Sequence, residues 1–302
     1  MDGALPVARA LHFAAALILE GSLAFQFWVL HPVFGRGGPI ESASRRIDRL
    51  AVVAAFLSGI LWVGLLGADL AGASLVDAFT QGADWMLLTR TLAGQVWIAR
   101  GAGFLLLGCW LLYSGGCSRA PAAHIALALS ILLSGSLAWT GHGASTSGWA
   151  GMLHTAADFA HLVAAGVWVG GLLLFLVTLN YGRRSVEVPL AQAATERFGD
   201  LALVSVGMLL LTGIVNSWMM LEDVADLFDT LYGSLLVVKM ALFAIMLLFA
   251  AANRLVLTPK LAPQGDAAGG AAARLGIHAS CEFALSLLII SIVGVLGTLA
   301  PR

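Results

Sequence analysis

Eight long apolar runs constrain this chain more strongly than any other feature of its sequence. Each run is long enough to cross the hydrocarbon core of a bilayer, for which a helix needs about 20 apolar residues. The runs cover residues 5–30, 48–70, 92–114, 121–140, 153–180, 199–220, 234–256 and 276–299. Because they are continuous rather than alternating, a transmembrane β-barrel is excluded. We therefore predict an all-α polytopic membrane protein, a bundle of eight transmembrane helices that forms a single membrane domain over residues 1–302.

The composition excludes several other classes of protein. Hydrophobic residues make up 60% of the chain and charged residues 11%, whereas a soluble domain is about 45–50% apolar and about 25% charged. The net charge of −1 offers no basic surface to nucleic acid, so the lipid bilayer is the partner that composition predicts. The chain has no CxxC pair, no GxxxxGK[ST] motif and no loop long enough for a soluble catalytic domain. We therefore expect no enzyme activity.

The basic residues indicate which ends of the spans face the cytoplasm. Eleven of the sixteen Lys and Arg residues lie in the connections between runs 1–2, 3–4, 5–6 and 7–8 or at the ends of the runs that border them. The other connections and the run ends beside them hold one basic residue, Arg90, and seven acids. The positive-inside rule then predicts that both termini lie outside and that the segment between runs 4 and 5 is periplasmic. Because no basic segment precedes the first run, we expect a retained helix there rather than a signal peptide.

Three of the seven histidines fall in the segment from 141 to 171, which reads GHGASTSGWAGMLHTAADFAHLVAAGVWVGG. His154, Asp158 and His161 are spaced i, i+4, i+7, which places them on one face of a helix near its outer end. His142 and Met152 precede them and can fold over the same end. Imidazole binds copper, zinc or iron, a thioether favours Cu(I), and an acid can ligate or can orient a histidine. The pattern predicts a metal site at these five residues, and the alternative is that the histidines are polar residues at the membrane interface.

A second group of polar or sulfur-bearing residues lies in the other spans, where an ionisable group is costly and commonly functional. We predict that this group forms a pathway or a second site. Its members are His12, Glu20, Asn216, Met219, Met220, Lys239, His278 and Glu282. Structural explanations stay open for them: pairing of His12 with Glu20, methionine as core filler, snorkelling of Lys239, and capping by His278 and Glu282.

The last third of the chain resembles the core of the CopD copper resistance proteins. The stretch RFGDLALVSVGMLLLTGIVNSWMM begins with Arg-Phe and carries Thr-Gly-x-x-Asn, and LYGSLLVVKMALFAIMLLFAAANRLVL carries Tyr-Gly-x-x-Leu-x-x-Lys and a closing Asn-Arg. The upstream stretch HTAADFAHLVAAGVWVGGL is similar to the histidine helix of the same family. We place the CopD-like core at residues 195–300.

The resemblance implies copper handling in the bacterial inner membrane, with a copper ion as the bound species. It also implies a partner, a small periplasmic copper-binding protein of the CopC type, as a separate chain. By the resemblance, His154, Asp158 and His161 map onto the family's histidine helix, and Asn216 and Lys239 map onto its other polar positions.

Two functions remain open at this point, beside a structural role without a bound metal. In the first, copper binds at the periplasmic face and is transferred across the membrane. In the second, the chain is a membrane b-type cytochrome that transfers electrons, with haem b held between paired histidines. The candidate pairs are His12 with His161 and His124 with His278.

Overall fold

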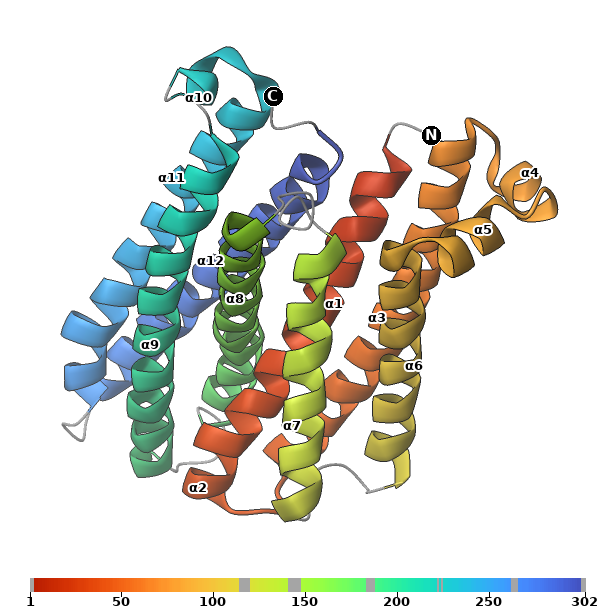
Figure 1. The fold of residues 1–302 in the computed structure, drawn as a ribbon. Helices are drawn as coiled ribbons and strands as arrows, with labels where there is room; N and C mark the ends of the chain where they lie inside the picture. Colours follow the sequence, from red (N-terminus) through yellow and green to blue (C-terminus); the bar gives the residue numbers. More distant parts are fainter. Residues whose placement is uncertain are drawn as a thin grey trace.

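The predicted bundle of eight helices is confirmed. A computed structural model describes residues 3–113, 120–140, 148–182, 188–221, 223, 225–261 and 266–299 of the chain. Eight helices within these residues are long and apolar enough to cross a membrane, and no strand occurs among them (Figure 1). Both termini lie at the same end of the bundle, which we call the terminal end.

The helices cross the bundle in alternating directions. The first span is continuous and consists of α1 (Ala4–Phe25), the π-helical turn η1 (Gln26–Leu30) and α2 (His31–Phe34). The spans that follow are α3 (Pro39–Ala71), α6 (Leu92–Tyr113), α7 (Ala120–Gly135) with the 3-10 turn η2 (Ser136–Thr140), α8 (Gly148–Gly182) and α9 (Val188–Met220). The last two spans are α11 (Leu231–Ala252), which continues into the turns η4 (Asn253–Leu257) and η5 (Thr258–Leu261), and α12 (Asp266–Leu296).

Several helices extend beyond the apolar runs that predict them. The helix α3 begins at Pro39, nine residues before the run that starts at residue 48. Its first turns contain Glu41, Arg45 and Arg46, so hydropathy marks only the part of the helix that is apolar. An apolar run therefore locates a span well, but the helix itself continues past the interface of the membrane.

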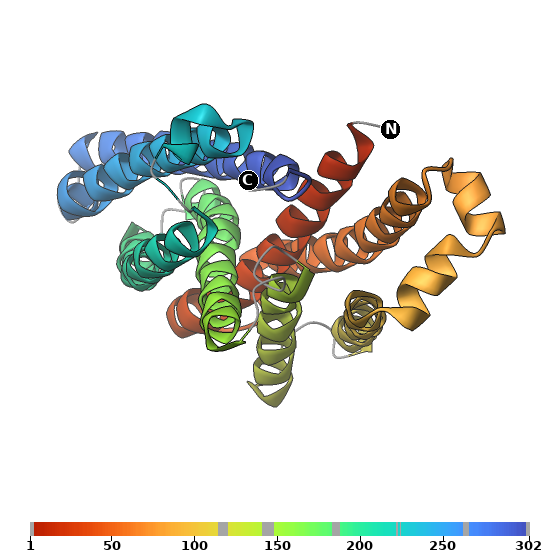
Figure 2. The ribbon, with the colours of Figure 1, turned by 45° about the horizontal axis from the view of Figure 1, so that its top comes forward.

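The connection between α3 and α6 is folded rather than extended. It forms two short helices, α4 (Leu75–Thr80) and α5 (Ala83–Arg90), beside the terminal ends of α3 and α6 (Figure 2). Ser74 caps α4, because its Oγ accepts a hydrogen bond from the backbone N–H of Asp77 at 3.2 Å. A third short helix, α10 (Asp226–Asp229), lies at the same end of the molecule before α11.

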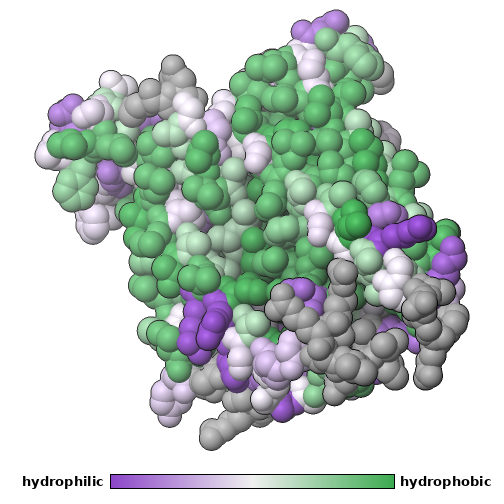
Figure 3. Space-filling view, turned by 180° about the vertical axis from the view of Figure 1, so that it is seen from behind, coloured by the Kyte–Doolittle hydropathy of each residue, from purple (hydrophilic) through white to green (hydrophobic). Residues whose placement is uncertain are grey.

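The first span is the centre of the bundle. It has the largest buried share of the eight spans, and α1 packs against α3, α7, α8 and α12. Seen from the terminal end, α3 and α6 lie on one side of α1, and α8, α9, α11 and α12 lie on the other (Figure 2). The face of the molecule seen from behind is broadly apolar across its middle, with hydrophilic side chains gathered mostly towards the two ends (Figure 3).

The closest helix contact in the centre is made by glycines. Gly21 of α1 lies against Gly166 and Gly170 of α8, and a Cβ added at Gly170 would lie only 2.6 Å from Leu17 O and 2.8 Å from Gly21 Cα. Real Cβ atoms essentially never approach other atoms this closely, so these positions require glycine. Small residues at such a crossing let two membrane helices pack backbone against backbone.

The crossing predicts a large and local effect on stability. Replacing Gly170 with Leu should lower the free energy of unfolding by about 3 kcal/mol or more, because the side chain would overlap the backbone of α1. The matched control is Gly207→Leu, since a Cβ at Gly207 of α9 meets nothing within 4 Å. The measurement is the midpoint of thermal unfolding in detergent, followed by size-exclusion chromatography. Equal midpoints for the two variants would contradict the crossing.

Candidate functional site

Several clusters of polar side chains lie inside the helical bundle within the described residues, and the first contains the predicted metal-binding face of α8. His161 Nδ1 lies 2.9 Å from Thr212 Oγ1 of α9. The Thr212 hydroxyl donates its own proton to the carbonyl of Met208 at 2.6 Å, so its oxygen accepts a hydrogen bond from Nδ1–H of His161. The Nε2 atom of His161 therefore keeps its lone pair, which is the form of imidazole that binds a metal.

Asp158 lies one turn before His161, towards the terminal end. Asn216 Nδ2 of α9 donates a hydrogen bond to Asp158 Oδ1 at 3.3 Å. From α11, the ammonium of Lys239 is close enough to interact electrostatically with both Asp158 and His161. We call Asp158, His161, Thr212, Asn216 and Lys239 the α8–α9 cluster. It unites the predicted histidine helix with two residues, Asn216 and Lys239, that the sequence assigns to a pathway.

The remaining predicted ligands lie closer to the terminal end or outside the described residues. His154 is buried one turn before Asp158, with an exposed fraction of 3%, whereas Met152 is 67% exposed. His142 lies outside the described residues. Within the described part of the chain, no three His, Cys, Asp or Glu side chains form a group that could hold a metal ion. The structure therefore brings Asp158 and His161 into one cluster and leaves Met152 at the surface.

The two candidate methionines of α9 lie at the terminal end of the same helix pair. Both are partly buried. The thioether of Met220 accepts a hydrogen bond from the hydroxyl of Tyr232 in α11, at 3.1 Å. Among the described residues, no hydrogen bond links Met219 to the α8–α9 cluster. Both residues lie in the last turn of α9, which ends at Met220.

The second cluster lies at the centre of the bundle. Glu20 is fully buried, and its Oε2 accepts a hydrogen bond from Ser134 Oγ of α7 at 2.5 Å. The carboxyl group lies against Gly166 of α8, where a side chain would displace it. The sequence predicts Glu20 as a functional candidate, but its partner Ser134 carries no signal, because a single serine in an apolar helix is common.

A further buried acid, Asp48 of α3, was not predicted. Its Oδ1 accepts a hydrogen bond from Ser22 Oγ at 2.5 Å, and its Oδ2 accepts one from Gln26 Nε2 at 2.9 Å. Because Asp48 stands at the first position of an apolar run, the sequence suggests a span end rather than a buried group. The two partners come from the first span, where η1 begins at Gln26.

The third cluster lies at the opposite end of the bundle, where α11 continues into η4. Asn253 Nδ2 donates a hydrogen bond to Glu282 Oε1 at 2.6 Å, and Asn253 Oδ1 lies 2.9 Å from His278 Nδ1. The sequence predicts His278 and Glu282 as an i, i+4 pair, and the structure links them through Asn253 instead. Asn253 is the first residue of the π-helical turn η4, and single π-turns occur frequently at functional sites.

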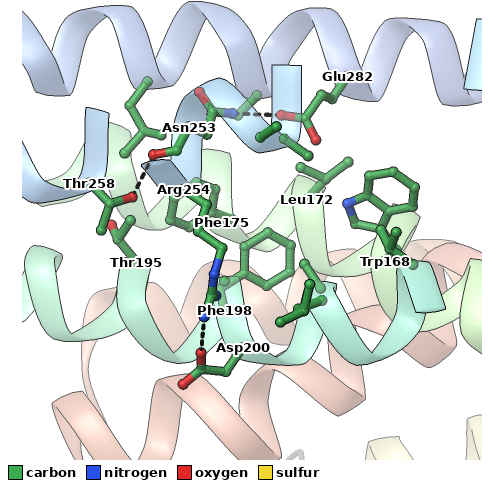
Figure 4. A pocket seen from close by; sticks show the side chains of 18 of the residues that line it. Trp168, Leu172, Phe175, Thr195, Phe198, Asp200, Asn253, Arg254, Thr258 and Glu282 are labelled. Atoms are coloured by element: carbon green, nitrogen blue, oxygen red, sulfur yellow. Dashed lines mark hydrogen bonds and ion pairs between the residues drawn. The ribbon is translucent and has the colours of Figure 1, made fainter. Parts of the chain in front are cut away.

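Glu282 also lines a cavity of about 540 Å³ between α8, α9, α11 and α12. The walls are mostly apolar and include Trp168 and Phe198 (Figure 4). At one side the exposed Arg254 and Asp200 form an ion pair with an N–O distance of 2.9 Å. The buried carboxyl group of Glu282 therefore faces an open cavity at the end of the bundle that lies away from the two termini.

The histidines proposed as haem ligands have contacts in different parts of the structure. His12 faces α3 and α6, where its Nδ1 lies 2.8 Å from the carbonyl of Ala55, whereas His161 faces α9. His124 of α7 packs against Phe27, and His278 of α12 packs against Phe249. The observed contacts place neither pair in a common cluster.

The profile described as "Copper resistance protein D-like, N-terminal domain" matches residues 1–152, and the profile described as "Copper resistance protein D" matches residues 192–296. Copper resistance protein D of Pseudomonas syringae pv. tomato is 28% identical over 87% of this chain and 89% of that protein. No solved structure matches the chain.

Two further relatives come from other bacteria. Copper transport protein CutJ of Bacillus subtilis is 30% identical over 82% of this chain, which spans 46% of that longer protein. Inner membrane protein YebZ of Escherichia coli is 25% identical over 97% of both chains. Since the N-terminal profile alone covers half of the 302 residues and the second profile covers a separate third, the chain belongs to the copper resistance protein D family and is a multi-pass protein of the inner membrane.

Proposed function

We propose that this protein binds copper at the periplasmic end of the bundle and transfers it across the inner membrane towards the cytoplasm. Family membership identifies copper as the metal that is handled at the membrane. The basic residues favour an orientation in which the terminal end is periplasmic. We propose that the protein moves its substrate without catalysing a reaction, and that copper is cargo rather than a resident cofactor.

The observation that carries the proposal is the imidazole of His161. Its Nδ1 is held by Thr212, and the metal-binding Nε2 is left with its lone pair inside the α8–α9 cluster. Histidines that bind metals are commonly oriented in this way by a second hydrogen bond. In this proposal His154, which lies about two turns nearer the terminal end of α8, and His161 each supply a nitrogen ligand. Met152 supplies a thioether suited to Cu(I).

Charge balance supports a site for a monovalent cation here. Asp158 and Lys239 carry opposite charges, so the cluster is close to neutral without metal. A copper ion that approaches Asp158 replaces part of the attraction to Lys239. When copper leaves, Lys239 again neutralises the charge of Asp158, so that the carboxylate is not left as an unpaired charge inside the membrane.

The Glu20 cluster and the Glu282 cluster are suitable binding sites for copper on its way to the cytoplasm. Glu20 lies at the centre of the bundle beside the α1–α8 crossing, and Glu282 faces a cavity at the other end. In this scheme copper leaves through the Glu282, Asn253 and His278 cluster into that cavity. On the periplasmic side, a CopC-type protein is the proposed donor, and it would deliver copper to the exposed end of α8 near Met152.

The first prediction concerns the receiving site. The double variant His154→Ala/His161→Ala should reduce copper accumulation by cells that overexpress the protein to the level of cells with an empty vector. The control is His124→Ala, because His124 is exposed on α7 and contacts Phe27 instead of the cluster. Cellular copper is measured by mass spectrometry at equal membrane abundance of each variant. Unchanged accumulation in the double variant would rule the receiving site out.

The second prediction isolates the orientation of His161. Replacing Thr212 with Val removes the oxygen that accepts Nδ1–H, and should weaken Cu(I) binding by about 10–100-fold, as loss of such partners does in other metal sites. The matched control is Thr178→Val in α8, whose hydroxyl bonds only the carbonyl of Leu174 in its own helix. Affinities are measured on purified protein by competition with a chromophoric Cu(I) chelator. Equal affinities in the two variants would show that Thr212 does not position the ligand.

The third prediction separates binding from exit. Glu282→Gln should retain Cu(I) binding at the periplasmic end, because Glu282 lies at the other end of the bundle, but should slow copper transfer into proteoliposomes by at least about tenfold. Glu196→Gln is the control, since Glu196 lines the same cavity but is exposed. Normal transfer by Glu282→Gln would remove this cluster from the path.

A further inference from the structure

A second cavity lies on the other side of α1 from the α8–α9 cluster. Its volume is about 510 Å³, within the range of about 300–1,000 Å³ that small-molecule sites occupy. It runs between α3 and α6, with α4 and α5 at its terminal end. Its rim includes exposed apolar residues, namely Ile60, Leu61, Phe79 and Ile98. Because exposed apolar side chains of a spanning helix face lipid, the cavity opens to the bilayer.

His12 is the polar group at the inner wall of this cavity. It is buried, with 1% of its surface exposed, and its ring lies 5.3 to 5.7 Å from the rings of Trp62, Trp97 and Phe104. Its Nδ1 donates a hydrogen bond to the carbonyl of Ala55 at 2.8 Å. The buried Nε2 atom is therefore an acceptor, and it has no hydrogen-bond partner among the described residues.

Arg100 of α6 provides the complementary donor. Its Nε and Nη2 bond Ser136 of η2, at 2.9 Å to the hydroxyl and 2.7 Å to the carbonyl, and its guanidinium stacks on Trp97 at 4.4 Å. The side chain is 2% exposed, yet its Nη1 has no hydrogen-bond partner in the described part of the chain. A buried donor without a partner is costly, so this group is expected to be satisfied by something that occupies the cavity.

Half of the buried side-chain polar atoms that lack a partner in the described residues belong to this cavity or to a pair of residues beside it. Ten buried side-chain atoms in the described residues have no hydrogen-bond partner, and three of them belong to residues that line this cavity: His12 Nε2, Arg100 Nη1 and Asp84 Oδ1. Two more, Arg9 Nε and Trp62 Nε1, belong to a stacked pair beside His12, with the guanidinium 4.4 Å from the ring centre.

We infer that this cavity binds a hydroquinone, a membrane-soluble aromatic alcohol with an apolar tail. A phenolic hydroxyl donates a hydrogen bond to a bare imidazole nitrogen and offers an oxygen that accepts one from a guanidinium N–H. The aromatic rings around His12 suit a flat aromatic head. The lipid-facing rim gives the tail a way out into the bilayer. The inference concerns binding alone, and it does not depend on copper transfer.

The charges in the cavity disfavour the two other obvious classes of ligand. A metal cation would lie beside the guanidinium of Arg100, with that of Arg9 stacked on Trp62 near His12. An anionic head group would meet the carboxylate of Asp84, which lines the same space. A neutral head that both donates and accepts hydrogen bonds avoids both repulsions, and this favours the phenol.

The test uses the full-length protein in detergent and a hydroquinone with a ten-carbon tail, kept reduced under anaerobic conditions. Gly101 lines the cavity, and a Cβ placed there meets nothing within 4 Å, so Gly101→Leu should fill the space without disturbing the helices. The matched control is Gly207→Leu on α9, which also meets nothing within 4 Å and lies outside the cavity. A second variant, His12→Phe, keeps an aromatic ring between Trp62, Trp97 and Phe104 but removes the acceptor nitrogen.

We expect saturable binding by the parent protein and by Gly207→Leu, measured by equilibrium dialysis, and affinity at least about tenfold weaker in Gly101→Leu and His12→Phe. Cu(I) affinity should be the same in Gly101→Leu as in the parent protein, which separates this inference from the copper site. Absence of saturable binding, or equal affinity in both cavity variants and the control, would overturn the inference. So would purification of the protein with haem or an anionic phospholipid that Gly101→Leu displaces.

Discussion

The backbone contact between α1 and α8 is the constraint on which the rest of the structure depends. Gly21, Gly166 and Gly170 leave no room for a side chain at the crossing, so two of the most buried spans meet directly. The same absence of a side chain at Gly166 makes space for the carboxyl group of Glu20. From this crossing α8 directs Asp158 and His161 towards α9, while α1 directs His12 towards α3 and α6. One contact therefore separates the two polar sides of the bundle.

Three buried or half-buried histidines share one arrangement. In His12, His161 and His278, Nδ1 lies 2.8 to 2.9 Å from an oxygen on another helix: Ala55 O, Thr212 Oγ1 and Asn253 Oδ1. An imidazole held in this way has a fixed ring orientation and presents Nε2 as its acceptor or ligand atom. In a bilayer no water competes for these bonds, so the neighbouring helix decides which nitrogen is available. Whether one of these imidazoles can accept a hydrogen bond or bind a metal through Nε2 therefore depends on how the helices pack as well as on the histidine itself.

Much of the architecture can be predicted from local sequence. Eight apolar runs gave the eight spans because the bilayer sets a fixed length for each. The 3.6-residue period placed Asp158 and His161 on one face of α8, where they meet α9. Partners distant in sequence could not be predicted in the same way. Ser134 lies 114 positions from Glu20 and Thr212 lies 51 from His161, and neither has a periodicity that distinguishes it from an ordinary polar residue in a helix. Asp48 was missed because an acid at the edge of an apolar run looks the same whether it faces water or a buried serine.

The distribution of charge favours different sides of the bundle for the two proposed ligands. On the side of α3 and α6, Arg9 and Arg100 are buried in stacks with Trp62 and Trp97. Each guanidinium would repel a cation by about 4 kcal/mol at 4 Å if the effective dielectric constant is about 20, and Asp84 is the single carboxylate among the residues that line the cavity in the described structure. On the side of α9 and α11, Lys239 is balanced by Asp158, and a ligand nitrogen of His161 lies beside them. These charges favour the second side for the proposed copper site and the first side for the proposed neutral aromatic alcohol. Because α1 lies between the two sides, the two proposals do not require one ligand to displace the other.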